Sequence, residues 1–555
     1  MFSSFRGYQR AWLSGDLVAG LTVWAVLVPE ALAYGAIAGV SPVVGLYAAP
    51  GALVLYAVFG SSKNLVVGPM AATAALSAAA VANLTTGGPG NFAAFTAMMA
   101  LGVGGIALLA GLLRLGFLAN FIAAPVLKGF VIGLALTIIV GQLPKIFGFE
   151  KGTGDFFEQA WDFLRHLGDT QWRTLLVGLT SFAIVMLLRR FAPAVPASLV
   201  AVAFGIAVVQ IFDLSHHGVA IVGPIPSGLP SFGLPHELSL SDYFATSASA
   251  VGIMLVGFAE GLAAAKSFAG HDQLIDPNRE LIGLGAANLG AGLSSGMVVN
   301  GSLSKTAVNH SAGARSQLSA VLAAALAVVT LLFLTGLFEK LPEATLGAIV
   351  IAALLELVDV ASLVSLYHLS TRRLSKIYGV AARPDFIAAM AAMLGVLIFD
   401  TLPGLFIGIA ASLLLLLYRA SEPHIAQLGQ VPGTSDQYSD VARHPTNTQV
   451  PDVVIVRVEG GLFFANADDT ARVIHARVTD THARTVILDA ETIPYVDISG
   501  VRMLDRLSSD LEATGVRLVL AHDIGQVRDL FDAADAHALI DNVYPTVQEA
   551  VNHVT

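Results

Sequence analysis

The chain has 555 residues, of which 55% are hydrophobic and only 13% are charged, with a formal net charge of −10. Soluble proteins carry about 25% charged residues, so this composition excludes an ordinary soluble protein and predicts a polytopic membrane protein. The absence of cysteine excludes disulfides, thiolate catalysis and cysteine-ligated metals.

Apolar segments follow one another from Leu17 to Tyr418, and several are shorter than the roughly 20 residues that a full crossing needs. We expect fourteen α-helical segments within a transmembrane domain of residues 1–419. They lie at 17–40, 43–60, 65–83, 93–113, 117–144, 173–188, 194–212, 244–265, 281–299, 301–312, 317–338, 344–358, 383–399 and 403–418.

The distribution of Lys and Arg predicts the orientation in the membrane. Most basic loop residues lie in alternate connections, which the positive-inside rule assigns to the cytoplasm. We therefore expect a multi-pass protein of the cytoplasmic (inner) membrane with both termini inside. The connection 145–172 is an exception, because Lys145, Lys151 and Arg165 would lie on the outer side.

The sequence also repeats itself. Glu30–Ala33 (Glu-Ala-Leu-Ala) is matched 230 positions later by Glu260–Ala263 (Glu-Gly-Leu-Ala), and Val66–Pro69 is matched 232 positions later by Val298–Gly301. This offset spans seven segments, an odd number, so the two repeats, about 15–212 and 243–419, would be inverted in the membrane. Short interrupted segments in corresponding places point to the central site of a transporter.

Gly296–His310 is the clearest of these interrupted segments. It reads as an extended piece from Met297 to Val299, a glycine joint at Gly301 and a helix from Ser302. Lys305 would lie in the first helical turn. A helix that begins inside a membrane directs its unpaired N–H groups and the positive end of its dipole at the gap, which suits a small anion.

Two carboxylates lie in corresponding places of the two repeats. Glu30 follows Pro29, which predicts a break in its segment, and an ionisable residue at membrane depth indicates function. The alternative is that Glu30 is satisfied by backbone groups or paired with Lys305. Glu260 would be a proton carrier or a sodium ligand, with a structural bridge to a backbone amide as the alternative.

Beyond Arg419 the composition changes. Residues 420–451 read as a polar linker, and residues 452–555 alternate strand-like and helix-like runs, which predicts a small cytoplasmic α/β domain. Strands are expected at 453–458, 462–464, 486–488 and 516–520. Ser499 lies between a strand and a helix, where it would be a helix N-cap or, alternatively, a regulatory phosphorylation site.

No phosphate-binding loop, nucleophile elbow, dinucleotide fingerprint or metal-ligand spacing of histidines occurs in the sequence. We therefore expect no enzyme activity, no cofactor or metal, no nucleic-acid partner and no ATP-driven pumping.

Several motifs together resemble the sulfate permease (SulP) family of anion transporters, relatives of the animal anion exchangers and prestin. They are Val28–Tyr34, Ser41–Tyr47, Pro125–Phe130, Gly223–Pro230, Asn278–Leu281 with Gly285 and Asn288, and Ser302–Thr306 with Asn309 and Gly313–Arg315. The carboxy-terminal part resembles the family's STAS domain, whose signature loop matches Asp497–Gly500.

The resemblance implies a seven-plus-seven inverted repeat with core and gate domains, a homodimer, and an anion held between half-helices that begin near Met70 and Ser302. The residues that it implies line or border the site are Glu30, Tyr34, Met70, Glu260, Ser302, Leu303, Ser304 and Lys305. The expected substrate-binding set also includes Gly68, Pro69 and Gly301, and the expected coupling-ion ligands are Glu30 and Glu260.

Two residues depart from the family pattern, in which Gln is common at position 30 and Arg at position 305. Glu30 adds a titratable group, which favours proton over sodium coupling, and Lys305 lacks the bidentate fork of arginine. We expect proton-coupled symport of sulfate, bicarbonate or a C4-dicarboxylate such as fumarate. The alternatives are a sodium-coupled bicarbonate symporter, an exchanger, a channel, or a sensor acting through its carboxy-terminal domain.

Overall fold

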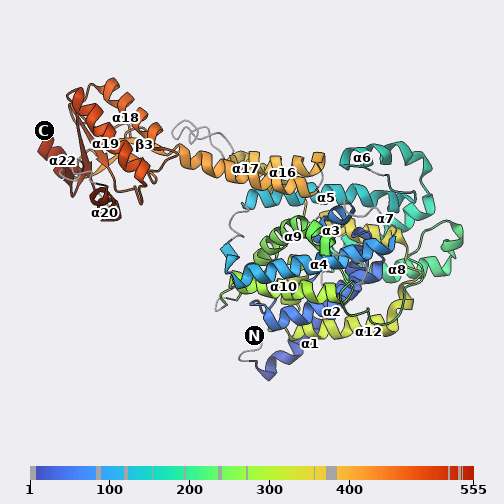
Figure 1. The fold of residues 1–555 in the computed structure, drawn as a ribbon. Coiled ribbons are helices and arrows are strands. Elements are labelled where there is room, and N and C mark those ends of the chain that lie inside the picture. Colours follow the sequence, from blue (N-terminus) through green and yellow to red (C-terminus); the bar gives the residue numbers. More distant parts are fainter. Residues whose placement is uncertain are drawn as a thin grey trace. The chain divides into compact units, whose positions relative to one another are not determined.

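A computed structural model describes residues 8–82, 89–117, 123–152, 154–192, 195–235, 240–270, 273–355, 357–369, 384–399, 401–522, 525–534, 539 and 542–555. The chain forms two compact units (Figure 1). The membrane unit comprises Met1–Ser365 and Asp385–Ser412, and the carboxy-terminal unit comprises Leu366–Pro384 and Leu413–Thr555.

Within the described residues, nine helices are long and apolar enough to cross a membrane. Three further apolar helices are shorter, at Ala71–Ala82, Ala197–Ile211 and Asp385–Phe399. These short helices fall where the sequence predicts segments below the spanning length. The prediction of a helical polytopic membrane protein is confirmed.

The described elements form two series in the same order. The first is α1 (Leu13–Ile37), α2 (Pro42–Phe59), β1 (Val66–Pro69) with α3 (Ala71–Ala82), α4 (Pro89–Leu112), α5 (Ala124–Phe147), α7 (Trp172–Phe191) and α8 (Ala197–Ile211). The second is α9 (Leu240–Ser267), α10 (Pro277–Leu293), β2 (Val299–Ser302) with α11 (Leu303–Ser311), α12 (Leu318–Val329), α13 (Glu343–Leu355), α16 (Pro384–Phe399) and α17 (Thr401–Ser421). Two helices, α6 (Phe156–Arg165) and α14 (Val360–Leu369), have no counterpart among the fourteen predicted segments.

The two series meet at an antiparallel ribbon. Strand β1 pairs with β2, with Val66 opposite Ser302 and Pro69 opposite Val299. Because the strands run in opposite directions, the two series are inverted, as predicted. The extended piece was placed wrongly at Met297–Val299: the pairing with β1 sets the strand at Val299–Ser302, so Gly301 lies inside it.

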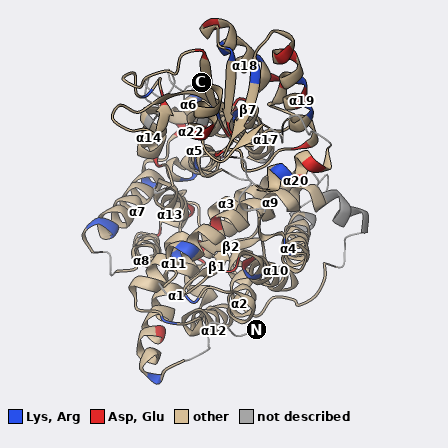
Figure 2. Ribbon diagram, turned by 90° about the vertical axis from the view of Figure 1, so that its left-hand side faces the viewer, with Lys and Arg blue, Asp and Glu red and all other residues tan. Residues whose placement is uncertain are grey.

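Figure 2 shows the ribbon in the middle of helices α1, α2, α3, α4, α9, α10 and α11, whose described ribbons carry few charged residues. Glycine at position 301 allows β2 to lie close to α9, because a Cβ there would be 2.9 Å from the Cα of Gly261 on α9. Helices α5, α7, α8 and α13 pack against one another as a second group in the same unit.

Two buried carboxylates hold helix ends of different series together. Asp16 of α1 accepts hydrogen bonds from the amides of Arg315 (2.7 Å) and Ser316 (3.1 Å) and from the Ser316 hydroxyl (2.7 Å), just before α12. Glu280 of α10 accepts bonds from the Tyr56 hydroxyl and from the Ser61 amide and hydroxyl, after α2. Backbone groups at these ends, which apolar helices leave without partners, are thereby satisfied.

The carboxy-terminal unit contains a six-stranded sheet in the order β4-β3-β5-β6-β7-β8. The strands are β3 (His424–Gln430), β4 (Tyr438–Asp440), β5 (Val453–Glu459), β6 (Thr485–Asp489), β7 (Arg517–Ala521) and β8 (Val543–Tyr544). The helices are α18 (Ala467–Thr481), α19 (Ile498–Ala513), α20 (Gly525–Ala533) and α22 (Val547–Val554). Alternate β5 residues serve two cores: Val454 and Val456 pack in the cluster of α18 and α19, and Val453 and Ile455 in that of α22.

The polar linker expected at 420–451 is wrong in part, because this segment supplies β3 and β4. Strand β3 pairs antiparallel with β5, and Ala426 and Leu428 are buried by that pairing. A short strand interrupted by Gly429 and followed by Pro432 carries too little apolar alternation to stand out. The strand expected at 462–464 is also wrong, since Leu462 makes only an isolated bridge to Val496.

Replacing Asp16 should weaken the junction between α1 and α12. Asp16→Ala leaves a buried amide, a part-buried amide and a buried hydroxyl without their acceptor, which costs about 3 kcal/mol. We expect a lower melting temperature of the detergent-purified protein than for Asp169→Ala, a change at an exposed carboxylate. Equal melting temperatures for the two variants would contradict the assigned role of Asp16.

Candidate functional site

Two helices begin at opposite ends of the ribbon. Helix α3 follows β1 and α11 follows β2, so both positive helix ends are directed at a ribbon about 10 Å long. Ser302 caps α11, because its hydroxyl accepts a bond from the Lys305 amide at 3.3 Å. Met70 precedes α3 and has no side-chain oxygen for a cap. The half-helix arrangement expected from the sequence is present.

The centre of the site is an ion pair. The Lys305 ammonium lies 2.7 Å from Oε2 of Glu30, and the two side chains are 1% and 3% exposed. The ammonium also donates to the carbonyl of Pro69 at 3.2 Å and lies 5.1 Å from the centre of the Tyr34 ring. The structure thus contains the pairing with Lys305, which is the alternative that the sequence offered to a functional role of Glu30.

Helix α1 carries Glu30 without a break. The sequence predicted an interruption after Pro29, but α1 runs continuously from Leu13 to Ile37 with Pro29 inside it. Tyr34 follows Glu30 by one helical turn, so both side chains lie on the face of α1 that contacts α11. The close packing of α1 against α2, α11 and α12 outweighs the backbone bond that proline removes.

A cavity of about 290 Å³ lies beside the pair. Glu30 and Ser304 line one side of it, and Arg189 and Ser198, from α7 and α8, line another. A water molecule occupies about 30 Å³ in the liquid, so the cavity has room for a small anion with part of its hydration shell. The site is thus an opening with mixed polar and apolar lining between two groups of helices of the membrane unit.

The structure brings most of the predicted site residues together, in different settings. Ser302 is buried, and its hydroxyl lies 3.2 Å from that of Ser304. Gly68 and Gly301 lie within the ribbon, and Met70 is half-buried at the start of α3. Leu303 is 51% exposed in the first turn of α11.

Glu260 occupies a different place. It lies on α9, where its Oε2 accepts a bond from the side-chain amide of Asn300 at 3.3 Å. The alternative predicted for Glu260 was a bridge to a backbone amide, whereas the observed partner is a side-chain amide. Asn300 faces Gly68 in the ribbon, so the second carboxylate contacts the ribbon and not the Lys305 pair.

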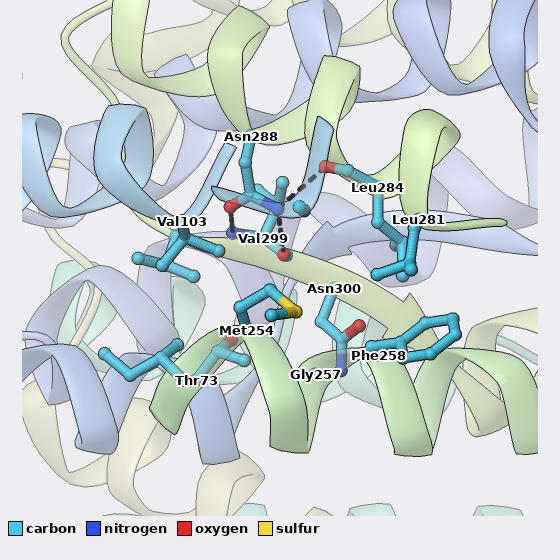
Figure 3. A pocket seen from close by; sticks show the side chains of 13 residues that line it. Thr73, Val103, Met254, Gly257, Phe258, Leu281, Leu284, Asn288, Val299 and Asn300 are labelled. Carbon is cyan, nitrogen blue, oxygen red and sulfur yellow. Dashed lines mark hydrogen bonds between the residues drawn. The ribbon is translucent and has the colours of Figure 1, made fainter. Parts of the chain in front are cut away.

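Figure 3 shows how Asn288 of α10 holds strand β2 of the ribbon. The side-chain amide of Asn288 donates to the Val299 carbonyl at 2.9 Å, and its oxygen accepts from the Val299 amide at 3.0 Å. Asn288 thus satisfies both backbone groups of Val299, as a neighbouring strand would. A cavity of about 10 Å³, lined by residues of α4, α9 and α10, lies there.

The sequence reasoning gave no role to several polar residues that hold the ribbon. Thr306 accepts from the Val66 amide, and Gln317 donates to the carbonyls of Ser62 and Leu65. The available signal was that both are polar residues next to long apolar segments. Their partners are about 240 to 255 positions away, so only the fold reveals the contacts.

In the carboxy-terminal unit, the interpretation of Ser499 as the helix N-cap is wrong. Asp497 caps α19, with its carboxylate accepting from the Gly500 amide at 2.8 Å and from the Phe464 amide at 2.9 Å. Ser499 is the second residue of α19 and is half-buried. The carboxylate of Asp497, two positions before Ser499, reaches an amide in the first turn of α19, as an N-cap side chain must.

Comparison with known proteins decides the family. Residues 13–380 match the model of the sulfate permease family, and residues 444–550 match that of the STAS domain. A probable sulfate transporter of Mycobacterium tuberculosis is 36% identical over 552 residues, which cover 99% of this chain and 96% of that protein. The chain belongs to the sulfate permease family. It is therefore a multi-pass transporter and not an enzyme.

Two solved structures carry the same fold. The murine solute carrier 26 family member A9 anion transporter aligns with a TM-score of 0.86 at 23% identity, covering 98% of this chain and 92% of that one. The transmembrane domain of the cyanobacterial bicarbonate transporter BicA aligns with a TM-score of 0.60 at 24% identity, covering 72% and 98%. The architecture is thus a helical membrane domain followed by an α/β STAS domain.

The ion pair should be detectable as a coupling energy in the folded protein. Lys305→Met leaves the Glu30 carboxylate buried without a partner, which costs about 3–5 kcal/mol. Adding Glu30→Gln removes that charge, so the double variant should recover more than half of the loss in melting temperature. Additive effects of the two changes would mean that the pair is not formed in the purified protein.

Proposed function

We propose that this protein is a secondary active transporter that binds a small anion beside the β1–β2 ribbon and carries it together with a proton. The observation that carries the proposal is the buried pair of Glu30 and Lys305, 2.7 Å apart, next to a cavity that Glu30 itself lines. Sulfate is the first candidate substrate, because the Mycobacterium tuberculosis relative is named a probable sulfate transporter. Bicarbonate and a C4-dicarboxylate such as fumarate follow.

The charge balance of the pair supplies the coupling. With Glu30 ionised, the pair is neutral and an entering anion meets a carboxylate. When Glu30 takes up a proton, the Lys305 charge is no longer compensated and attracts the anion. Two unit charges 4 Å apart interact by about 4 kcal/mol at an effective dielectric constant of 20, enough to decide between binding and exclusion. Proton and anion then bind with positive, reciprocal coupling.

Lys305 supplies attraction, and neighbouring groups supply the shape of the site. A lysine ammonium is a point charge without the planar fork that arginine offers to an oxyanion. The Ser304 hydroxyl borders the cavity, and the amides of the first turn of α11 and the start of α3 add positive dipole ends. The proposed substrate-binding residues are Glu30, Tyr34, Gly68, Pro69, Met70, Gly301, Ser302, Leu303, Ser304 and Lys305.

Glu260 is proposed as a second coupling residue. Its contact with Asn300 connects it to the ribbon, so a change in its charge acts on the same element that carries the anion. A carboxylate is also an oxygen ligand that suits a hard cation, so a sodium-coupled bicarbonate symporter is the alternative. Uptake driven by a proton gradient in sodium-free liposomes separates the two, since the sodium mechanism predicts none.

Transport would proceed by alternating access. The cavity lies between α1 and α11 on one side and α7 and α8 on the other, so sliding of these groups past each other would move the anion. An exchanger would need anion on both sides of the membrane, and a channel would carry uncoupled current. Saturable accumulation against an anion gradient supports the proposed symport.

We also propose the cellular setting. The transport domain, residues 1–419 with inverted repeats at about 15–212 and 243–419, would be a homodimer in the cytoplasmic membrane. Both termini and the STAS domain would lie in the cytoplasm. These proposals are supported by the bias of basic residues between connections and by the family resemblance.

Ser499 is proposed as a regulatory phosphorylation site. A phosphate at the second position of α19 would gain from the helix dipole but would face the capping carboxylate of Asp497. Because Asp497 holds the cap, Ser499→Ala should change stability by less than about 0.5 kcal/mol. Transport in cells should nevertheless lose its regulation in this variant; identical transport by both proteins under all growth conditions would exclude the role.

Glu30→Gln should remove the dependence of anion uptake on external pH. The wild-type protein should lose uptake as pH rises, because ionised Glu30 neutralises Lys305. The variant keeps the Lys305 charge free at every pH, so its apparent anion affinity at high pH should equal or exceed that of the wild type. The measurement is initial uptake of labelled sulfate into liposomes at a series of external pH values.

Asp169→Asn is the matched control, since it removes an exposed carboxylate between α6 and α7. It should keep the wild-type pH profile. If Glu30→Gln also keeps that profile, Glu30 has no part in coupling.

Lys305→Ala should weaken anion affinity at least several-fold, because it removes the positive charge that attracts the anion. An unchanged affinity for sulfate, bicarbonate and fumarate would remove Lys305 from the binding site.

A further inference from the structure

Helix α6 carries an exposed apolar stripe that the transport site does not use. Phe157, Trp161 and Leu164 are 52%, 57% and 55% exposed. Their spacing of four and three residues places them on one face of the helix. The helix begins with a full capping box between Asp155 and Glu158, so its register is fixed.

A second face of α6 packs against the protein. The ring of Phe163 lies 5.0 Å from that of Phe147 in an edge-to-face arrangement, and 5.7 Å from that of Phe149. The side-chain oxygen of Gln159 lies beside Gly141 of α5. The exposed stripe is therefore an outer surface of α6 and not the face that holds the helix in place.

The position of α6 along the membrane normal follows from these contacts. Phe147 is the last residue of α5, a helix of 24 residues that is long enough to span the hydrocarbon. The amide of Gln171 donates to the Phe147 carbonyl at 2.9 Å, so α7 begins at the same level. Figure 1 shows α6 beside the end of α5. Helix α6 thus lies where two spanning helices meet the membrane surface.

The residues around the stripe are typical of the level at which spanning helices meet the membrane surface. Arg165 lies 5.1 Å over the ring of Trp161, and Arg173 lies 5.5 Å over the ring of Trp172, which is 63% exposed. Tryptophan is enriched at membrane–water interfaces, where an arginine extends its charged end toward the headgroups. Helix α7 has an exposed apolar face of its own, formed by Trp172, Leu176 and Leu179.

We propose that the Phe157–Trp161–Leu164 stripe binds the bilayer at the boundary between acyl chains and headgroups, and so fixes the depth of α5 and α7. Lipid is favoured over a protein partner as the occupant, because α7 begins at the same level, is long enough to span the membrane and exposes an apolar face of its own. The proposal also accounts for Arg165, one of the three basic residues of 145–172 that depart from the positive-inside bias. Arg165 belongs to an interfacial helix and is not a topology signal.

The absence of cysteine from the chain allows a direct test with single-cysteine variants. Leu164→Cys places a nitroxide label on the stripe, and Asp169→Cys places one at an exposed carboxylate beyond the end of α6. The full-length protein is reconstituted in phosphatidylcholine nanodiscs, and power-saturation spectroscopy measures collision with oxygen and with a water-soluble nickel chelate. We expect the ratio of oxygen to nickel accessibility to be several-fold higher at position 164 than at position 169.

Two results would overturn the proposal. Equal nickel accessibility at both positions would place the stripe in water. Exclusion of both reagents at position 164 would mean that protein, such as a second copy of the chain, covers it. If the cysteine variants do not fold, brominated lipids test the wild-type chain: quenching of its tryptophan fluorescence should decrease in Trp161→Phe, and an unchanged quenched fraction would likewise exclude lipid contact.

Discussion

The membrane unit depends on one buried ion pair at the crossing of its two repeats. Glu30 comes from α1 and Lys305 from α11, and the ammonium reaches across to the Pro69 carbonyl at the end of β1. Removing two charges from water is expensive, and a well-packed apolar pair would often be equally stable or more so. The pair is therefore better explained by what its charges do than by stability. The pair lies beside a cavity, where its charges would act on a bound anion.

A second constraint is that extended backbone at membrane depth must find partners inside the protein. Four residues of β1 and four of β2 pair with each other, and side chains of Asn288, Thr306 and Gln317 satisfy neighbouring backbone groups. This network leaves the starts of α3 and α11 at fixed places relative to Lys305. The polar residues of the ribbon thus serve the geometry of the site, even where they do not line the cavity.

The sequence predicted the fold well wherever one local signal was sufficient. Fourteen apolar segments and the interrupted stretch near Ser302 have counterparts in the structure, because length, hydropathy and a polar helix start are properties of short windows. The errors occur where distant pairing decides: the register of β2 depends on β1, and β3 forms because β5 lies beside it. Asp497 was missed as a cap because Ser499 is an equally good local candidate.

The site residues were likewise predicted where a local signal was sufficient and missed where distant packing decides. Glu30 and Lys305 stand out as charges in apolar segments, and their pairing was part of the structural alternative that the sequence left open. Arg189 and Ser198 were not assigned to the cavity, since they lie at segment ends where polar residues are ordinary. Only the packing of α7 and α8 near α11 places them there.

The account makes proton and anion binding a single event at the Glu30–Lys305 pair, and titration calorimetry tests this most directly. Sulfate binding to the purified protein would be measured at one pH in buffers of different ionisation enthalpy, whose slope gives the protons taken up per anion bound. The account predicts an uptake of about one proton in the wild type and of almost none in Glu30→Gln, because binding and protonation are reciprocally linked. Sulfate binding by the wild type without proton uptake would contradict it.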